Sequence, residues 1–370
     1  MIAWRWRWFL VAIILAVFVR FMIMPSIPEF PRDSDNKLQK AEVIFIPDFL
    51  GPESLAFDVH GKGPYTGVAD GRIMRWNGPK DGWTEFAHTS SNRSAICNPG
   101  MPPALRLELE HICGRPLGMR FDKHGNLYIA DAYYGLHVVG VEGGLAKTLV
   151  TEAEGVPLAF TNDVEIADDG LVYFTDSSSK YHRREFVLMF MGGDESGRLL
   201  TFNPSTGETM VILNGLQFPN GIALSKDKSF LVMSETLTCR VMRLWLKGPE
   251  RGKLEVFATL PGYPDNIRRT ESGDFWVAIH SQPNMLLKLP SGIRRGLLRL
   301  PISFTSLYTK VAGKLAKGMI IKLSPDGVIK EVMEDNEGKV VRLVSEVEEH
   351  DGKLWLGSVI LPQIGVLHES

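Results

Sequence analysis

Short apolar stretches separated by polar turns run through most of the chain, and one unit of this pattern recurs. In its clearest copy, Phe218-Pro219-Asn220-Gly221 opens an apolar stretch, Lys226-Asp227-Lys228 follows, and a second apolar stretch runs from Ser229 to Ser234. The polar break between two apolar stretches predicts two β-strands joined by a tight turn. We expect Pro219 and Gly221 to form a turn of their own that presents the Asn220 side chain at the start of the first strand.

Variants of this unit occur six times, and the repeat decides the predicted fold. Each copy consists of a strand, an Asp/Gly turn and a second strand, followed by one or two further strand-like segments. Repeats of about four strands are typical of propeller blades, so we expect an all-β, six-bladed β-propeller. A solenoid is the alternative, but its repeats would be shorter and more regular. The residues at the position of Asn220 in the six copies are Glu53, Leu117, Asn162, Asn220, Asp265 and Ser345.

Composition and charge fit this prediction. The 370 residues are 44% hydrophobic, which suffices for a large core, and 36 glycines and 22 prolines suit many short strands joined by turns. The formal net charge is −2, so no basic surface argues for a nucleic-acid partner.

The N-terminus is expected to be separate from the fold. Trp4-Arg5-Trp6-Arg7-Trp8 is cationic and aromatic, and an unbroken apolar run from Phe9 to Val19 follows it. This pattern is typical of a signal peptide or of an uncleaved signal-anchor helix, and no small-x-small cleavage site follows, which favours the anchor. We therefore predict a signal anchor or signal peptide at 1–24, a linker at 25–40 and the propeller at 41–370. The arginines favour a cytosolic N-terminus, contact with the membrane through this segment and a lumenal body.

Two further features agree with a lumenal location. Asn92-Arg93-Ser94 is a sequon for N-glycosylation, with Asn92 as the acceptor. Cys97 and Cys113 flank a proline-rich loop that a disulfide would close in an oxidising compartment. Cys239 lies in a strand pattern and is interpreted as a buried structural thiol.

The side chains at the six equivalent positions also predict a binding site. At the start of each inner strand they should form a ring around the central channel, and Asn266 lies beside Asp265. All of the six side chains except Leu117 bear a carboxylate, an amide or a hydroxyl oxygen, and hard oxygen ligands of this kind suit Ca²⁺. The alternative is that these asparagines and aspartates only form turns at strand ends.

Several motifs together resemble a known family, the strictosidine synthase-like proteins of plants, which are related to the animal adipocyte plasma membrane-associated protein. The motifs are Cys113 to Asp122, Phe174 to Ser178, Gly197 to Leu200, Phe218 to Gly221 and Glu349 to Gly352. The resemblance covers about residues 41–367. It implies a six-bladed propeller, a location in the secretory pathway, either the endoplasmic reticulum membrane or the vacuole, and a disulfide between Cys97 and Cys113.

The same resemblance argues against the best-known activity of the family. Strictosidine synthase performs a Pictet–Spengler condensation of tryptamine with secologanin, using a Glu four residues before the Glu-His-Asp-Gly motif. Ser345 occupies that position here, and a hydroxyl is not a base of the required strength. Strand alternation predicts that Glu346 points to the opposite side. Condensing activity is kept as an alternative function.

The wider superfamily includes the paraoxonases, which are calcium-dependent lactonases and esterases. This relationship implies that five residues bind calcium and that Asp265 or a metal-bound water supplies the attack, with His280 as the acid/base candidate. The paraoxonase histidine pair falls at Leu117 and near Asp131. We predict a calcium-dependent hydrolase of ester- or lactone-type small molecules that binds its substrate in the channel; a non-catalytic ligand-binding propeller is the alternative. The five predicted calcium ligands are Glu53, Asn162, Asn220, Asp265 and Asn266.

Two segments have no place in the repeat. Ser178 to Asp194 is expected to form a loop over the channel mouth and so to shape substrate choice. Gly292 to Lys317 is a basic and apolar insertion. It is expected to form either a lid or membrane-surface segment or a solvated insertion packed on the blades.

Overall fold

The computed structural model describes residues 30–47, 49–97, 103–283, 289–299 and 316–368. The chain divides into two units, Met1–Pro31 and Arg32–Ser370. The predicted signal anchor at 1–24 lies outside the described residues. In the part of the chain that is described, no helix has the length and apolar character needed to cross a bilayer.

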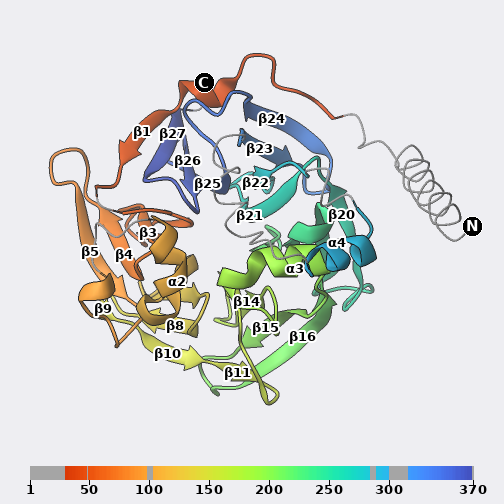
Figure 1. Ribbon diagram of the computed structural model, residues 1–370, viewed down its shortest axis with the longest axis horizontal. Coiled ribbons are helices and arrows are strands. Elements are labelled where there is room, and N and C mark those ends of the chain that lie inside the picture. The colour runs from red at the N-terminus through yellow and green to blue at the C-terminus, as the bar shows by residue number, and fades with distance from the viewer. Residues whose placement is uncertain (1–29, 48, 98–102, 284–288, 300–315, 369–370) are drawn as a thin grey trace, which may run out of the picture. The chain divides into compact units, whose positions relative to one another are not determined.

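The second unit is a mainly-β, six-bladed propeller (Figure 1). Six antiparallel sheets of four or more strands follow one another around a common centre, and a separate two-stranded hairpin, β11 (Glu152–Ala153) with β12 (Val156–Pro157), projects from the third blade. Neighbouring inner strands contact each other around the centre. The six-bladed fold predicted from the repeat is therefore confirmed.

The strands occupy equivalent places in each blade. The inner strands are β2 (Leu55–Ala56), β6 (Pro116–Phe121), β13 (Thr161–Ile166), β17 (Pro219–Leu224), β21 (Tyr263–Arg269) and β25 (Val344–His350). The second strands are β3 (Tyr65–Gly67), β7 (Leu127–Asp131), β14 (Val172–Asp176), β18 (Phe230–Glu235), β22 (Phe275–Ser281) and β26 (Lys353–Ser358). The third strands are β4 (Arg72–Trp76), β8 (Gly135–Val139), β15 (Gly197–Phe202), β19 (Arg240–Trp245), β23 (Gly318–Leu323) and β27 (Gln363–His368). The outer strands are β5 (Trp83–His88), β10 (Lys147–Val150), β16 (Thr209–Leu216), β20 (Leu254–Thr259), β24 (Ile329–Asp335) and β1 (Glu42–Phe45).

The sixth blade joins the two ends of the propeller sequence. Its outer strand β1 comes from the beginning and pairs antiparallel with β27, with Glu42 opposite Val366 and Phe45 opposite Gln363. A second clasp lies between the first two blades, where β9 (Gly144–Leu145) adds to the edge of β5 as a parallel strand. These pairings tie blades together through backbone hydrogen bonds.

The hydrophobic core is a set of layers between the blades. One layer joins the fifth and sixth blades through Trp276, Ile320 and Leu354, and another joins the third and fourth through Leu199 and Ile222. Each layer buries the faces of two sheets, as the alternating pattern of the strands requires. Asp131 and Asp176, the last residues of β7 and β14, are buried but do not belong to the ring.

The predicted linker at 25–40 needs a correction in its last part. Leu38, in the short helix η1 (Lys37–Lys40), is fully buried in the layer between the fifth and sixth blades. Arg32 forms an ion pair with Glu334 at 2.9 Å, and the Asp33 carboxylate accepts the Glu334 backbone N–H at 2.9 Å. This stretch is polar in composition, but its single leucine and its charged side chains fit the outer edge of β24.

Short helices lie at one end of the channel. They are α2 (Pro103–Cys113), η3 (Arg183–Glu185), α3 (Phe186–Gly192) and α4 (Ser291–Leu297), and Figure 1 shows α2 and α3 over the inner ends of the blades. The segment predicted as a loop over the channel mouth thus contains two helical turns. Arg294 of α4 donates to the Phe190 carbonyl of α3, so the two short helices are joined. Residues 300–315 of the predicted insertion lie outside the described part.

Candidate functional site

A β-bulge in each of five inner strands places the ring residues. In β17, Pro219 pairs with Glu235 and Ile222 with Met233, so β17 holds one residue more than β18 over this interval. Equivalent register shifts occur in β6, β13, β21 and β25. A bulge breaks the alternation of side chains, so two consecutive residues can face the same side. The expected turn at the start of the unit is therefore a bulged strand instead.

The glycine of the repeated unit serves close packing of the strands. A Cβ atom on Gly221 would lie 2.4 Å from the Asn266 Cα of the next inner strand, and one on Gly118 would lie 2.1 Å from Asp163 Oδ1. No side chain fits at such distances, so glycine lets neighbouring inner strands approach and narrows the ring.

The five predicted calcium ligands are buried at the inner ends of the first, third, fourth and fifth blades. Asn220 Nδ2 donates to Asp265 Oδ1 at 2.7 Å, and Asn266 Nδ2 donates to Glu53 Oε1 at 3.0 Å. Asn162 Nδ2 donates to the Ser177 hydroxyl at 3.0 Å. Four of these residues are thus linked in pairs between blades by side-chain hydrogen bonds.

Their remaining oxygens are buried acceptors. Glu53 Oε2 and the Oδ1 atoms of Asn162, Asn220 and Asn266 have no hydrogen-bond partner among the described residues. Buried polar atoms without a partner are rare because each costs about 1–3 kcal/mol. Four such oxygens, all on predicted calcium ligands, fit a hard cation that accepts carboxylate and amide ligands.

The two ring carboxyls are strongly perturbed. Burial, reinforced by the Asp265 charge, raises the pKa of Glu53 well above its usual range, and burial raises the pKa of Asp265 to about 7. A bound cation would stabilise both charges. In the described part of the chain, no cluster of three or more His, Cys, Asp or Glu side chains is arranged to hold a metal ion. Any metal at the ring therefore depends on the asparagine oxygens as well.

The other two ring positions contribute no metal ligand. Leu117 packs in an apolar cluster with Phe160, Met189 and Phe218. Ser345 Oγ donates to the backbone carbonyl of Glu53 at 2.7 Å, so its hydroxyl links the sixth blade to the first. Neither side chain offers a base.

His280 lies beside the ring. Its Nδ1 is 3.7 Å from Asp265 Oδ2, and burial together with the Arg183 charge lowers its pKa to about 4. The imidazole is therefore neutral at physiological pH. The structure thus brings the two predicted catalytic residues, Asp265 and His280, next to each other.

Asp131, at the place of the missing second histidine, has a structural role. Its two carboxylate oxygens accept the Thr89 hydroxyl at 2.5 Å and the backbone N–H groups of Arg115, Tyr133 and Tyr134 at 2.8–3.1 Å. A carboxylate with four donors shapes the turn after β7 and is not free to move protons.

A buried ion network lies further along the inner strands, at the centre of the propeller. Arg268 Nη1 is 2.6 Å from Asp163 Oδ2, its Nη2 is 2.7 Å from Glu346 Oε2, and Glu346 also accepts the Ser54 hydroxyl at 2.9 Å. These residues come from four blades, so they can meet only at the centre. Glu346 was predicted to point away from the channel; the bulge at Ser345 turns it inward instead.

The mouth side carries a second charged cluster that the sequence analysis missed. Glu110 of α2 is within 2.6 Å of Arg183 Nη1 through both carboxylate oxygens and 3.6 Å from Arg115 Nε. Arg115 also donates to the Gly51 carbonyl at 2.9 Å. Arg115 lies in a quoted motif and Arg183 in the segment expected over the mouth, but their convergence depends on tertiary structure.

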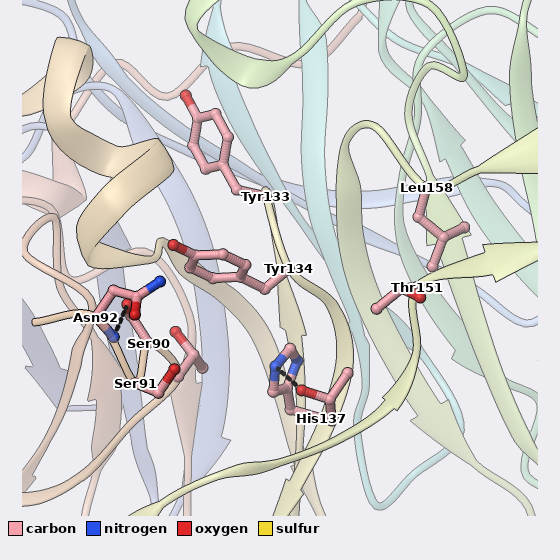
Figure 2. A pocket seen from close by; sticks show the side chains of 10 residues that line it. Ser90, Ser91, Asn92, Tyr133, Tyr134, His137, Thr151 and Leu158 are labelled. Carbon is pink, nitrogen blue, oxygen red and sulfur yellow. Dashed lines mark hydrogen bonds between the residues drawn. The ribbon is translucent and has the colours of Figure 1, made fainter.

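The predicted lumenal features lie at the rim of the second blade. Cys97 and Cys113 form a disulfide, the pairing that the family resemblance implied. Asn92 is exposed, as glycosylation requires. A cavity of about 180 Å³ beside it is lined by hydroxyls and tyrosines (Figure 2). The His137 ring within it is paired with Thr148 Oγ1 at 3.0 Å. The cavity contains no ring residue.

The fold and the ring define the class of protein as a six-bladed propeller with a polar central site, and sequence comparison gives the family. A strictosidine synthase profile matches residues 162–249, and a profile of the N-terminal part of strictosidine synthase-like proteins matches residues 34–76. Protein strictosidine synthase-like 10 of Arabidopsis thaliana is 52% identical over 338 residues, 90% of this chain and 89% of the relative. The chain belongs to the strictosidine synthase-like family. The adipocyte plasma membrane-associated protein of Rattus norvegicus is 36% identical over 338 residues, 89% of this chain and 86% of the relative.

Solved structures share the fold at low sequence identity. A gluconolactonase from Xanthomonas campestris has a TM-score of 0.58 at 15% identity and covers 94% of this chain and 99% of its own. Regucalcin from Agrobacterium tumefaciens, a calcium-binding protein, has a TM-score of 0.56 at 12% identity and covers 88% of this chain and 93% of its own. At these identities the likeness establishes the fold alone.

Proposed function

We propose that this protein is a calcium-dependent hydrolase of ester- or lactone-type small molecules, with its substrate bound in the central channel. The observation that carries the proposal is the set of four buried acceptor oxygens without partners, on Glu53, Asn162, Asn220 and Asn266. With Asp265 they offer two carboxylates and three amides, a donor set that suits calcium better than zinc or magnesium.

Calcium, Asp265 and His280 would have different roles in the hydrolysis. When bound, calcium would polarise a carbonyl oxygen and stabilise the negative charge that develops on it. Asp265 Oδ2 lies 3.7 Å from His280 Nδ1, and the carboxylate can take a proton from an attacking water that lies next to the imidazole. His280 stays neutral because its pKa lies at about 4, which favours hydrogen bonding over strong base catalysis.

The structural neighbours support this proposal at the level of the fold. A gluconolactonase and a calcium-binding regucalcin have the same propeller fold. Because fold does not determine activity, the support for hydrolysis comes from the ring itself. The buried arrangement of Ser345 argues against the condensing activity of strictosidine synthase.

The location follows from the disulfide and the family. A disulfide is typical of oxidising compartments, and the animal relative named above is a plasma membrane-associated protein. Together they indicate the secretory pathway. We further propose that residues 1–24 anchor the chain in the endoplasmic reticulum membrane or target it to the vacuole, with the propeller in the lumen.

The test is an assay of purified protein with aryl esters and lactones, with calcium or with excess chelator. We expect weak hydrolysis that requires calcium. Asp265→Asn should reduce the rate more than His280→Gln, since the carboxylate is both ligand and base. Leu117→Ala is the matched control, because Leu117 occupies a ring position but offers no oxygen. Hydrolysis that is equal with and without chelator would refute the proposal.

A second candidate is a ligand-binding propeller without turnover. It is favoured by the structural use of Asp131, which leaves the channel without the histidine pair of related hydrolases. In that case small molecules would bind in a calcium-dependent way and be recovered unchanged. Mass spectrometry of the bound ligand after prolonged incubation separates the two.

A further inference from the structure

We propose that Arg183 binds a carboxylate group of the substrate at the channel mouth, so that the enzyme acts on esters or lactones that carry a second, anionic group. This inference rests on the proposed hydrolase function and names its substrate class. It comes from the charged cluster of Glu110, Arg115 and Arg183, which the hydrolytic chemistry does not use.

The cluster holds two guanidinium groups and one carboxylate. Glu110 and Arg115 have side chains 3% and 0% exposed, and Arg183 Nη1 bonds both oxygens of Glu110 at 2.6 Å. The Tyr133 hydroxyl donates to the same carboxylate at 3.2 Å. Both Glu110 oxygens thus accept from the same Arg183 nitrogen, Nη1, and the rest of this guanidinium takes no part in the pair.

Of the two arginines, Arg183 keeps donors for a ligand. Arg115 is committed, because its Nη1 and Nη2 donate to the backbone carbonyls of Gly51 and Val359. Arg183 uses only Nη1; its Nε and Nη2 have no acceptor among the described residues, and its side chain is 14% exposed. These two nitrogens form the side edge of the guanidinium, which matches the two oxygens of a carboxylate.

The position of Arg183 is fixed before a ligand arrives. The Arg184 backbone N–H donates to the Tyr133 hydroxyl at 3.1 Å, and His182 and Glu185 form reciprocal capping hydrogen bonds around η3. Next along the chain, Met189 of α3 is buried against Leu117 and Phe218. A preorganised guanidinium loses little freedom on binding, so it can discriminate between substrates.

Arg183 also lies on the substrate side of the ring. Phe190 of α3 packs on Tyr263 with ring centroids 5.4 Å apart, and Tyr263 precedes Asp265 by two positions in β21. The Arg183 charge opposes the effect of burial on the pKa of Asp265 and adds to it on the pKa of His280. A molecule with its scissile carbonyl at the ring can therefore reach Arg183 with a carboxylate on a short, apolar spacer.

The experiment compares 4-nitrophenyl acetate, which is neutral, with 4-nitrophenyl hemiglutarate, which carries a carboxylate. We expect kcat/KM to be higher for the hemiglutarate. Arg183→Met should lower the ratio of the two kcat/KM values about 10- to 100-fold, the usual range for loss of a hydrogen-bonded ion pair. Arg183→Lys should recover part of the ratio. The control is Arg184→Met: among the described residues the Arg184 side chain forms no hydrogen bond or ion pair with Glu110, so this variant should keep the ratio.

A second readout does not depend on turnover. Calorimetry should show glutarate binding to the calcium-loaded protein and loss of that binding in Arg183→Met, with circular dichroism confirming that the variant is folded. Hydrolysis of both esters with an unchanged ratio in Arg183→Met would overturn this inference and leave the hydrolase intact. If neither ester is hydrolysed, the hydrolase proposal fails and calorimetry decides: glutarate binding that needs Arg183 supports the carboxylate site, and equal or absent binding refutes it.

Discussion

Asn220 Nδ2 donates a hydrogen bond to Asp265 Oδ1 at 2.7 Å, although the two residues belong to neighbouring blades. Asn266 of the fifth blade and Glu53 of the first form a second amide–carboxylate pair at 3.0 Å. In each pair the amide nitrogen offsets part of the cost of burying the carboxylate, while the amide oxygen keeps no partner among the described residues. The amides therefore hold the carboxylates in place and still have an oxygen to offer a cation.

Calcium should stabilise the propeller, because it ties together residues from four blades. At a free calcium concentration of one hundred times Kd, mass action contributes about 2.7 kcal/mol. For a domain of this size that is a rise in Tm of about 4 °C. Differential scanning fluorimetry with calcium and with excess chelator measures it.

Two variants test whether the rise in Tm comes from calcium at the ring. Glu53→Ala should abolish the calcium-dependent shift, since it removes one carboxylate ligand. Leu117→Ala should retain the shift, although its Tm can be lower. Identical melting curves in calcium and chelator would remove the metal from the site.

The stability of the calcium-free protein should fall as pH rises. Burial raises the pKa of Asp265 to about 7 from an ordinary value of 3.8, so the folded state holds this proton more tightly than the unfolded state does. Its contribution is therefore fully present below pH 3.8 and is lost as pH rises through 7. Urea unfolding in chelator between pH 5 and pH 8 should show this decline, and Asp265→Asn, which cannot titrate, should show less of it. An equal pH dependence in both proteins would contradict the prediction.

Arg268 should be among the most important single side chains for folding. Its loss leaves the Asp163 and Glu346 carboxylates, both fully buried, without their cation. Removing one partner of a buried ion pair typically costs about 3–5 kcal/mol. Arg268→Met should lower the free energy of unfolding by that amount, whereas Arg269→Met, at the partly exposed next position, should cost less than about 1 kcal/mol.

The residues of the channel show which features could be predicted from the sequence alone. The repeat predicted six blades, and the ring position within each copy was found because polar side chains recur there. The orientation of Glu346 could not be predicted, because alternation assigns it to the far side and only the bulge brings it inward. The Glu110–Arg183 pair joins segments 73 residues apart, and no local pattern marks such a contact.

Strictosidine synthase activity should be absent. Ser345 Oγ is engaged with the Glu53 carbonyl at 2.7 Å and cannot act as the required base, whose loss typically costs 10²–10⁴-fold in rate. Incubation with tryptamine and secologanin, followed by chromatography, should give no product above background. Ser345→Glu tests the alignment directly, since trace condensation would show that the rest of the channel suits it. Robust activity in the unmodified protein would mean that another carboxylate has taken the role.

Expression in a secretory host should yield a glycoprotein. Asn92 is exposed near the Cys97–Cys113 disulfide, and its glycan should give a mass shift that a glycosidase removes. Asn92→Gln should lack the shift, while thiol labelling should detect Cys239 as the single reduced cysteine. Unmodified protein with three reactive thiols would place the propeller in a reducing compartment.

The ion network around Arg268 has a kinetic consequence. Because these buried side chains from four blades meet at the centre of the propeller beyond the ring, we expect substrate to enter and product to leave from the other side, past η3 and α3. A product must leave by the route that the next substrate needs, so the two cannot pass each other. The carboxylate that Arg183 is proposed to bind remains on one of the products, and that product should be a competitive inhibitor.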